Sequence, residues 1–207
     1  MEDLSYEQQA HDAGYALVCG VDEAGAGPLM GPVYAAAVIL PEKFELPGLN
    51  DSKKLTEKKR EALFLRIQQQ ALTWSVASVS AGEIDETDIL SARMKAMQLA
   101  IDGLTPAADF ALIDGNRDHG TKYAVSTPHR TVVGGDGVSM SIAAASILAK
   151  VSRDRFVTDV LDKQYPQYQF ARHKGYGTRL HYAMLDEYGP CPCHRKTFLK
   201  KWEAGRP

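Results

Sequence analysis

The sequence lacks the features of membrane, secreted and disordered proteins. No apolar run reaches the roughly 20 residues that a membrane-spanning helix needs, and the first ten residues are too polar and acidic for a signal peptide. Only three cysteines are present, Cys19, Cys191 and Cys193, which fits a reducing compartment. There are no repeats, low-complexity tracts or evident linkers. We therefore expect a cytoplasmic globular protein that does not bind a membrane.

The spacing of the cysteines does not predict a zinc site. The run Cys191-Pro192-Cys193-His194 reads Cys-x-Cys-His instead of Cys-x-x-Cys, and no second ligand pair follows or precedes it. A loop with incidental cysteines is the interpretation that this spacing favours.

The chain also lacks an excess of charge of one sign. Its 207 residues are 44% hydrophobic and 24% charged, with a net charge of −2, which fits about one folded domain and excludes an indiscriminate polyanion binder. The charges are unevenly spread, with eight acids and one base in residues 1–50 but three acids and eight bases in residues 172–207. The basic end could hold a nucleic acid against acids near the N-terminus, although a mixed solvated surface explains the same pattern.

Hydrophobic periodicity predicts an α/β layered domain with a mixed sheet. The apolar run at 33–40 is nearly continuous, as in a strand buried on both faces. An α/β domain over residues 1–163 and a helical lobe over residues 164–207 are expected. Strands are expected over 17–22, 33–40, 74–79, 110–113 and 131–133, and helices over 56–71, 86–104 and 139–162.

Four acids follow the ends of predicted strands, each beside a glycine: Asp22, Glu23, Asp114 and Asp136. Crowded carboxylates repel one another unless a cation neutralises them, and hard oxygen ligands suit Mg²⁺ or Mn²⁺. Two such ions about 4 Å apart can cleave a phosphodiester. The alternative is that these acids are ordinary turn residues. Adjacent strand residues also point to opposite faces, so Asp22 and Glu23 share a site only if the strand twists or ends there.

Residues 25–31 resemble a dinucleotide-binding loop only superficially. Their spacing is G-x-G-x-x-x-G, Pro28 lies inside the loop, and a buried strand follows where a helix would be required. These glycines are better suited to exposing backbone N–H groups to a phosphate or another substrate oxygen.

Six ordered sequence blocks, which together span residues 18–198, resemble the signatures of the ribonuclease HII family. They are GVDEAGAGPL at 20–29, NDSKKL at 50–55, LIDGN at 112–116, GD at 135–136 with SIAAASILAKV at 141–151, HKGYGT at 173–178 and HRKTF at 194–198.

The resemblance implies a ribonuclease H-like fold, with a mixed five-stranded sheet flanked by helices and a C-terminal helical extension. It implies a metal-dependent endonuclease that hydrolyses the RNA strand of RNA–DNA hybrids and cuts 5′ to ribonucleotides embedded in duplex DNA. The products would be a 3′-hydroxyl and a 5′-phosphate. The family's catalytic and metal-binding carboxylates fall on Asp22, Glu23, Asp114 and Asp136, and two Mg²⁺ or Mn²⁺ ions are expected. We expect a monomer.

The resemblance also suggests substrate contacts. The backbone of Gly25, Ala26 and Gly27 is expected to read the ribose 2′-hydroxyl, the group that distinguishes RNA from DNA. Tyr176 matches a tyrosine that packs against the sugar at the RNA–DNA junction. Phosphate contacts are expected from residues after a loop, and weaker candidates lie elsewhere. These candidates are Ser52, Lys53, Lys54, Asn116, Ser146, Lys150 and His173.

Two positions depart from the family pattern. The family usually has arginine or lysine where this chain has Ala26, and lysine where it has Gly135. Both changes remove positive charge near the carboxylates, so we expect a working metal site with weaker substrate positioning. A binding protein with little catalysis and a different nuclease or transposase-like enzyme on the same fold are the competing interpretations.

Overall fold

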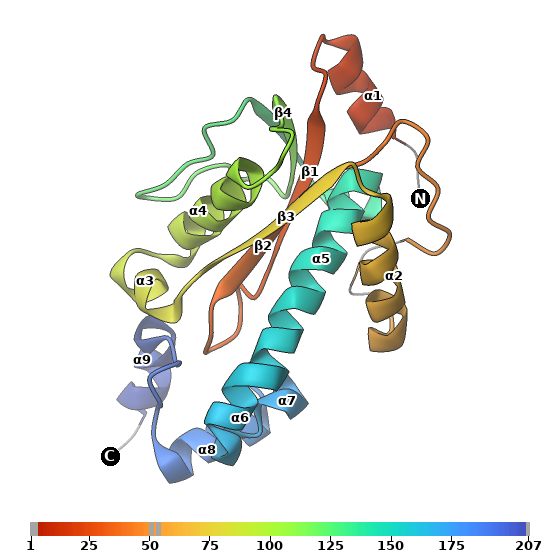
Figure 1. The fold of residues 1–207 in the computed structure, drawn as a ribbon. Coiled ribbons are helices and arrows are strands. Elements are labelled where there is room, and N and C mark those ends of the chain that lie inside the picture. Colours follow the sequence, from red (N-terminus) through yellow and green to blue (C-terminus); the bar gives the residue numbers. More distant parts are fainter. Residues whose placement is uncertain (1–3, 50–51, 53–54, 206–207) are drawn as a thin grey trace.

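A five-stranded mixed sheet forms the centre of the molecule (Figure 1). The computed structural model describes residues 4–49, 52 and 55–205. The strand order is β3-β2-β1-β4-β5, with β2 antiparallel to both β1 and β3, and β4 and β5 parallel to β1 and to each other. This confirms the predicted fold class. The strands are β1 (Val18–Ala24), β2 (Val33–Ile39), β3 (Thr73–Val79), β4 (Phe110–Asp114) and β5 (His129–Val132).

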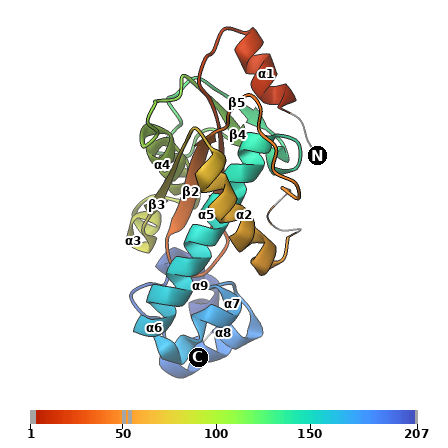
Figure 2. The same ribbon diagram turned by 45° about the vertical axis from the view of Figure 1, so that its right-hand side comes forward.

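Helices cover both faces of the sheet (Figure 2). One face packs on α4 (Ile89–Asp102), whose Met94 and Met97 are fully buried. The other packs on α5 (Met140–Phe156) and α2 (Glu57–Gln70). Two shorter helices complete this part, α1 (Ser5–Asp12) and α3 (Ala81–Glu86).

Small residues let α5 approach β1 very closely. A Cβ atom at Gly20 would lie 2.1 Å from the backbone carbon of Ser141, so only glycine fits at this point of β1. The helix begins at the N-cap Ser139, whose hydroxyl accepts the N–H of Ile142, and its first three turns are buried alanine, serine and aliphatic residues. As a result, α5 lies against the part of the strand that carries Asp22.

The C-terminal helices pack at the far end of α5 (Figure 2). A π-helical stretch, Val157–Leu161, continues α5 and leads into this lobe. The core of the lobe also contains Leu29 and Met30, from the loop that follows β1. The domain boundary at residue 163 therefore stays a prediction. The helices are α6 (Asp162–Gln164), α7 (Phe170–His173), α8 (Arg179–Tyr188) and α9 (Lys196–Ala204), with a 3-10 turn at Pro166–Tyr168.

Several predicted boundaries differ from the structure. The helix expected over 86–104 is α4, which begins later, at Ile89, because the Asp88 side chain caps it by accepting the N–H of Ser91. The short helix α3, which precedes it, was not predicted. The strand expected to end at Asp22 continues to Ala24. Among the described residues, no helix has the length and apolar character needed to cross a membrane.

Candidate active site

Three aspartates from separate segments meet near the C-terminal ends of the neighbouring strands β1 and β4. Carboxylate oxygens of Asp22, Asp114 and Asp136 all lie within 4.8 Å of one another. Asp22 lies within β1, Asp114 ends the neighbouring strand β4, and Asp136 lies in the 3-10 turn Gly135–Gly137 that precedes α5. We call these three residues the acid cluster.

Asp22 is held where its charge is strongly disfavoured. Its side chain is only 4% exposed, and burial raises its pKa well above the usual value. The negative charges of Glu23 and Asp114 add to this increase in pKa. Hydrogen bonds from the Glu23 N–H, at 2.7 Å, and from Ser146 oppose it only in part. A divalent cation would remove this electrostatic penalty, so the donor set fits a hard metal ion.

A glycine turn brings Asp136 to Asp114. Gly134 has φ +64°, and the N–H of Gly135 donates to Asp114 Oδ1 at 2.7 Å. A Cβ atom at Gly135 would lie 2.5 Å from Ile142 Cδ1 and 3.3 Å from the same Asp114 oxygen. The turn at Gly135 therefore has no room for a side chain unless Ile142 moves.

Glu23 faces away from the acid cluster. Because β1 continues to Ala24, its successive side chains alternate between the two sheet faces, and Asp22 and Glu23 point to opposite sides. Glu23 Oε1 lies 2.7 Å from an Arg93 nitrogen on α4. The structure thus places three of the four predicted carboxylates together. Glu23 lies outside this group, but its charge still raises the pKa of Asp22.

One face of α5 continues from the acid cluster to the C-terminal lobe. Ser146 shares a hydrogen bond of 2.7 Å with the Ser52 hydroxyl, and its own hydroxyl bonds to Asp22. One turn later, Lys150 Nζ lies 5.7 Å from the centre of the Tyr176 ring. The predicted contacts Ser52, Ser146, Lys150 and Tyr176 therefore form a continuous line.

Tyr176 lies beside the glycine loop, by which we mean residues 25–31. A Cβ atom at Gly27 would be 3.9 Å from Tyr176 Cε1, and the Leu29 N–H donates to the Gly175 carbonyl at 2.9 Å. Tyr176 is 43% exposed, so part of its side chain is accessible to a bound molecule. Two segments more than 140 residues apart in sequence thus form one edge of the site.

A buried arginine that the sequence analysis did not single out holds the glycine loop. The Arg195 guanidinium is fully buried and donates to four carbonyl oxygens at 2.6–2.9 Å, those of Gly25, Ala26, Pro28 and Gly31. Burial lowers its pKa to about 9, and the nearby positive charge of Arg153 adds to the shift. Arg195 lies in the HRKTF block, which could have marked it as important, but the sequence does not show which residues it contacts.

Arg153 supports the same loop from α5. Its side chain is fully buried, and it donates to the Lys174 carbonyl at 2.9 Å. It packs so closely under Gly25, whose φ is +93°, that a Cβ atom there would lie 2.2 Å from Arg153 Nε. Its guanidinium carbon is 5.9 Å from the Tyr176 ring centre. Glycine at position 25 is therefore required by both the backbone angle and Arg153.

The remaining predicted substrate contacts do not belong to the line formed by Ser52, Ser146, Lys150 and Tyr176. His173 is buried; its Nε2 bonds to the Tyr168 carbonyl at 3.0 Å, and its Nδ1 accepts the Gly175 N–H at 3.2 Å. It therefore supports the loop that carries Tyr176 from within the C-terminal lobe. Asn116 is exposed just beyond β4. Lys53 and Lys54 lie outside the described residues.

Comparisons with known proteins agree on one family. A family profile described as Ribonuclease HII matches residues 19–201. Ribonuclease HII proteins from Syntrophotalea carbinolica and Caldicellulosiruptor saccharolyticus are each 50% identical to this chain, covering 94% of it and 91% and 92% of their own lengths. The crystal structure of ribonuclease H2 from Pyrococcus horikoshii superposes with a TM-score of 0.73 at 26% identity, covering 91% of this chain and 98% of that one. The chain belongs to the ribonuclease HII family of endoribonucleases.

Proposed function

We propose that this protein hydrolyses the RNA strand of RNA–DNA hybrids and cuts 5′ to ribonucleotides embedded in duplex DNA. The observation that carries the proposal is the continuous face formed by the acid cluster, α5, the glycine loop and Tyr176. Carboxylates for metal-assisted hydrolysis lie at one end, and groups suited to reading a sugar lie at the other.

Asp22, Asp114 and Asp136 would hold the divalent ion, Mg²⁺ or Mn²⁺. Once bound, such an ion activates water and stabilises the charge that develops on a phosphodiester. The fold buries Asp22 and Asp136 and holds the half-buried Asp114 beside them, where the Gly135 N–H orients it. We propose Glu23 as a ligand of the second ion, which requires its side chain to leave Arg93.

Recognition of RNA is proposed for the other end of the face. Arg195 bonds to carbonyls of the glycine loop and so holds its backbone, and we propose that the N–H groups of Gly25, Ala26 and Gly27 read the 2′-hydroxyl. The exposed Tyr176 ring would pack against the next sugar, and Lys150 beside it would meet a phosphate. A cytoplasmic location and a monomeric state stay predictions of the sequence.

The decisive assay uses three labelled duplexes in Mg²⁺: DNA with one ribonucleotide, an RNA–DNA hybrid, and all DNA. We expect cleavage of the first two, with a 3′-hydroxyl and a 5′-phosphate at the cut, and an intact third duplex. A chelator should stop the reaction. Binding without cleavage would favour the non-catalytic alternative, and cleavage of all-DNA duplex would favour a different nuclease.

The departure at Ala26 supplies a further prediction. Its half-buried side chain cannot form the charged contact that the family's usual arginine or lysine provides. We expect Ala26→Arg to raise the cleavage rate on a single embedded ribonucleotide by about two- to fivefold, the range of an exposed ion pair. Measured kcat/KM for the two proteins checks this, and an unchanged value would show that the position does not matter here.

A further inference from the structure

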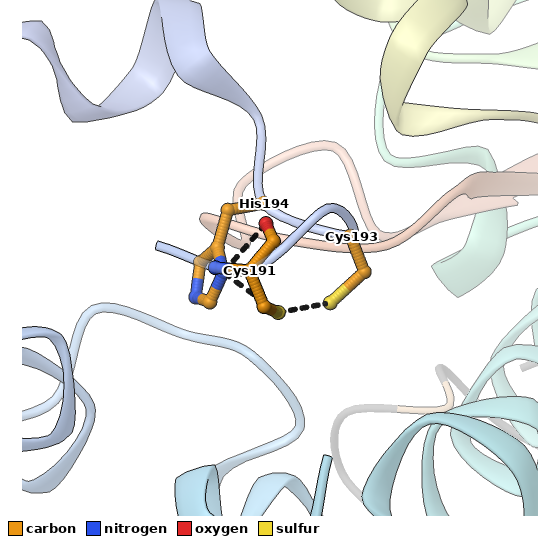
Figure 3. Close-up of side chains that lie close together, drawn as sticks. All are labelled: Cys191, Cys193 and His194. Atoms are coloured by element: carbon orange, nitrogen blue, oxygen red, sulfur yellow. Dashed lines mark hydrogen bonds between the residues drawn. The ribbon is translucent and has the colours of Figure 1, made fainter. Parts of the chain in front are cut away.

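The connection between α8 and α9 holds a second group of metal-ligand atoms. Cys191 Sγ, Cys193 Sγ and His194 Nδ1 all lie within 4.8 Å of one another (Figure 3). Cys191 Sγ is 3.2 Å from Cys193 Sγ and 3.1 Å from His194 Nδ1. The sulfurs are farther apart than the roughly 2.05 Å of a disulfide bond. They are nevertheless close enough for both to reach one ion at about 2.3 Å.

Hydrogen bonds fix the His194 ring with a lone pair toward the cysteines. His194 Nδ1 accepts the Cys191 N–H at 3.0 Å, with the Cys191 carbonyl farther away at 3.3 Å, which assigns the ring proton to Nε2. Nε2 then donates to His181 Nε2 at 3.0 Å, and His181 Nδ1 donates to the Tyr176 carbonyl at 3.0 Å. The opposite tautomers would leave His181 Nδ1 without a proton facing that carbonyl. A ring whose second nitrogen donates in this way is oriented as metal-binding histidines are.

The backbone around these three residues is held in place before any ion binds. His194 is 3% exposed and forms a β-bridge with Met30, and the Gly31 N–H donates to the Cys193 carbonyl at 2.9 Å. Cys193 also lines a pocket of about 490 Å³ together with Gly31 and Phe156. This pocket would let an ion or a solvent ligand reach the Cys193 side of the group.

We propose that Cys191, Cys193 and His194 form a binding site for a thiophilic divalent ion of the zinc type. Two thiolate sulfurs and one imidazole nitrogen would be the protein ligands. Among the described residues, no further cysteine, histidine or acid joins this group, so the fourth position is open to solvent. Binding releases the protons that the two sulfurs still carry, and Nδ1 exchanges the hydrogen bond from the Cys191 N–H for the metal.

This proposal revises the interpretation drawn from spacing alone. A Cys-x-Cys-His run lacks a second ligand pair, but the fold turns the His194 ring back onto the two sulfurs and so supplies a third ligand. The acid cluster contains only oxygen donors, which suit hard ions, whereas sulfur donors select softer ones. The two groups should therefore take different metals from the same solution.

The position of this site gives it a structural role. Arg195, the next residue, holds the glycine loop through four carbonyls. An ion that ties residues 191, 193 and 194 together would brace the segment from which Arg195 projects. We therefore expect the bound ion to raise the thermal stability of the chain, since an ion that binds only the folded state stabilises it.

The test uses the reduced, metal-free full-length chain titrated with Co²⁺, a spectroscopic substitute for zinc. We expect a thiolate-to-cobalt charge-transfer absorption that saturates at one ion per chain and is removed by added Zn²⁺. The acid cluster cannot produce this signal because it contains no sulfur. Cys193→Ser should weaken Co²⁺ binding by about tenfold or more. The matched control is Cys19→Ala, which changes the buried thiol on β1 and should leave the titration unchanged.

A second measurement needs no variant. Zn²⁺ should slow alkylation of Cys191 and Cys193 by iodoacetamide in the wild-type chain, read residue by residue by mass spectrometry. Circular dichroism and retained RNA cleavage would show that each variant is folded. The absence of a charge-transfer band, an equal band in Cys193→Ser, or alkylation unaffected by Zn²⁺ would each overturn the proposal.

Discussion

The acid cluster and the three histidines of the C-terminal lobe, His173, His181 and His194, respond to burial in different ways. Burial raises the pKa of Asp22 in the acid cluster, and it lowers the pKa of His173 and that of His181, the latter to about 4. The ring nitrogens of these histidines bond to one another and to backbone carbonyls, and these hydrogen bonds need no added charge. Three packed carboxylates cannot do this, and they mark a place prepared for a cation.

Neutralising one residue of the acid cluster should have the largest effect, a loss of cleavage activity. Asp136→Asn removes a metal ligand but keeps the side-chain size, so we expect cleavage to fall by at least about a hundredfold, beyond the loss from changing an outer partner. The fold should persist. Single-turnover cleavage of a duplex with one ribonucleotide measures the effect. Asp159→Asn, an exposed acid outside the acid cluster, is the control and should retain activity.

Removing Arg195 should weaken the contact between the C-terminal lobe and the glycine loop. Arg195→Met leaves four loop carbonyls without their donor, so we expect the free energy of unfolding to fall by at least about 2 kcal/mol. Preference for the ribonucleotide-containing duplex should fall as well, because the glycine loop loses its support. Urea unfolding and kcat/KM on the two substrates are the measurements. Unchanged values, matching Lys200→Met on the exposed side of α9, would contradict this role.

Asp22→Asn should separate catalysis from stability. Because the folded state raises the pKa of Asp22 above its ordinary value of 3.8, the folded chain binds the proton more tightly than the unfolded chain. Without metal, stability therefore falls as pH rises above 3.8, and Asn removes this loss. In chelator at neutral pH, we expect the variant to melt about 2–4 °C higher, the shift for about 1 kcal/mol. A lower melting temperature would show that the carboxylate is not strained.

Acid should destabilise the C-terminal lobe through His181, whereas it favours the folded state at Asp22. The pKa of His181 is lowered from 6.5 to about 4, so its contribution to stability is present above pH 6.5 and is lost as pH falls toward 4. We expect the smallest of these effects here, a steeper fall in stability between pH 6.5 and 4.5 for wild type than for His181→Asn. Urea midpoints across this range measure it, and parallel curves would exclude His181 as the cause.

The sequence predicted the sheet, its helical layers and four carboxylates, of which the structure brings three together, because each depends on local pattern. The apolar run of β2 and the glycines after each acid are visible without coordinates. The length of β1 was not predictable in this way, since Glu23 and Ala24 look like a turn until β2 is seen to pair with them. That single extension decides which face Glu23 occupies.

The buried arginines and the histidine network could not be predicted, because they depend on contacts across the chain. Arg195 bonds to residues more than 160 positions earlier, and Glu23 meets Arg93 only because α4 crosses that face of the sheet. Charged residues are also usually exposed, so sequence alone places Arg153 and Arg195 at the surface.

Crystals soaked in Mn²⁺ and measured at its absorption edge test the central claim most directly. An anomalous peak within bonding distance of Asp22, Asp114 and Asp136, absent after the same soak of Asp136→Asn crystals, is the result we predict. A wild-type crystal with no peak at these carboxylates, or with its strongest peak elsewhere, would contradict the account.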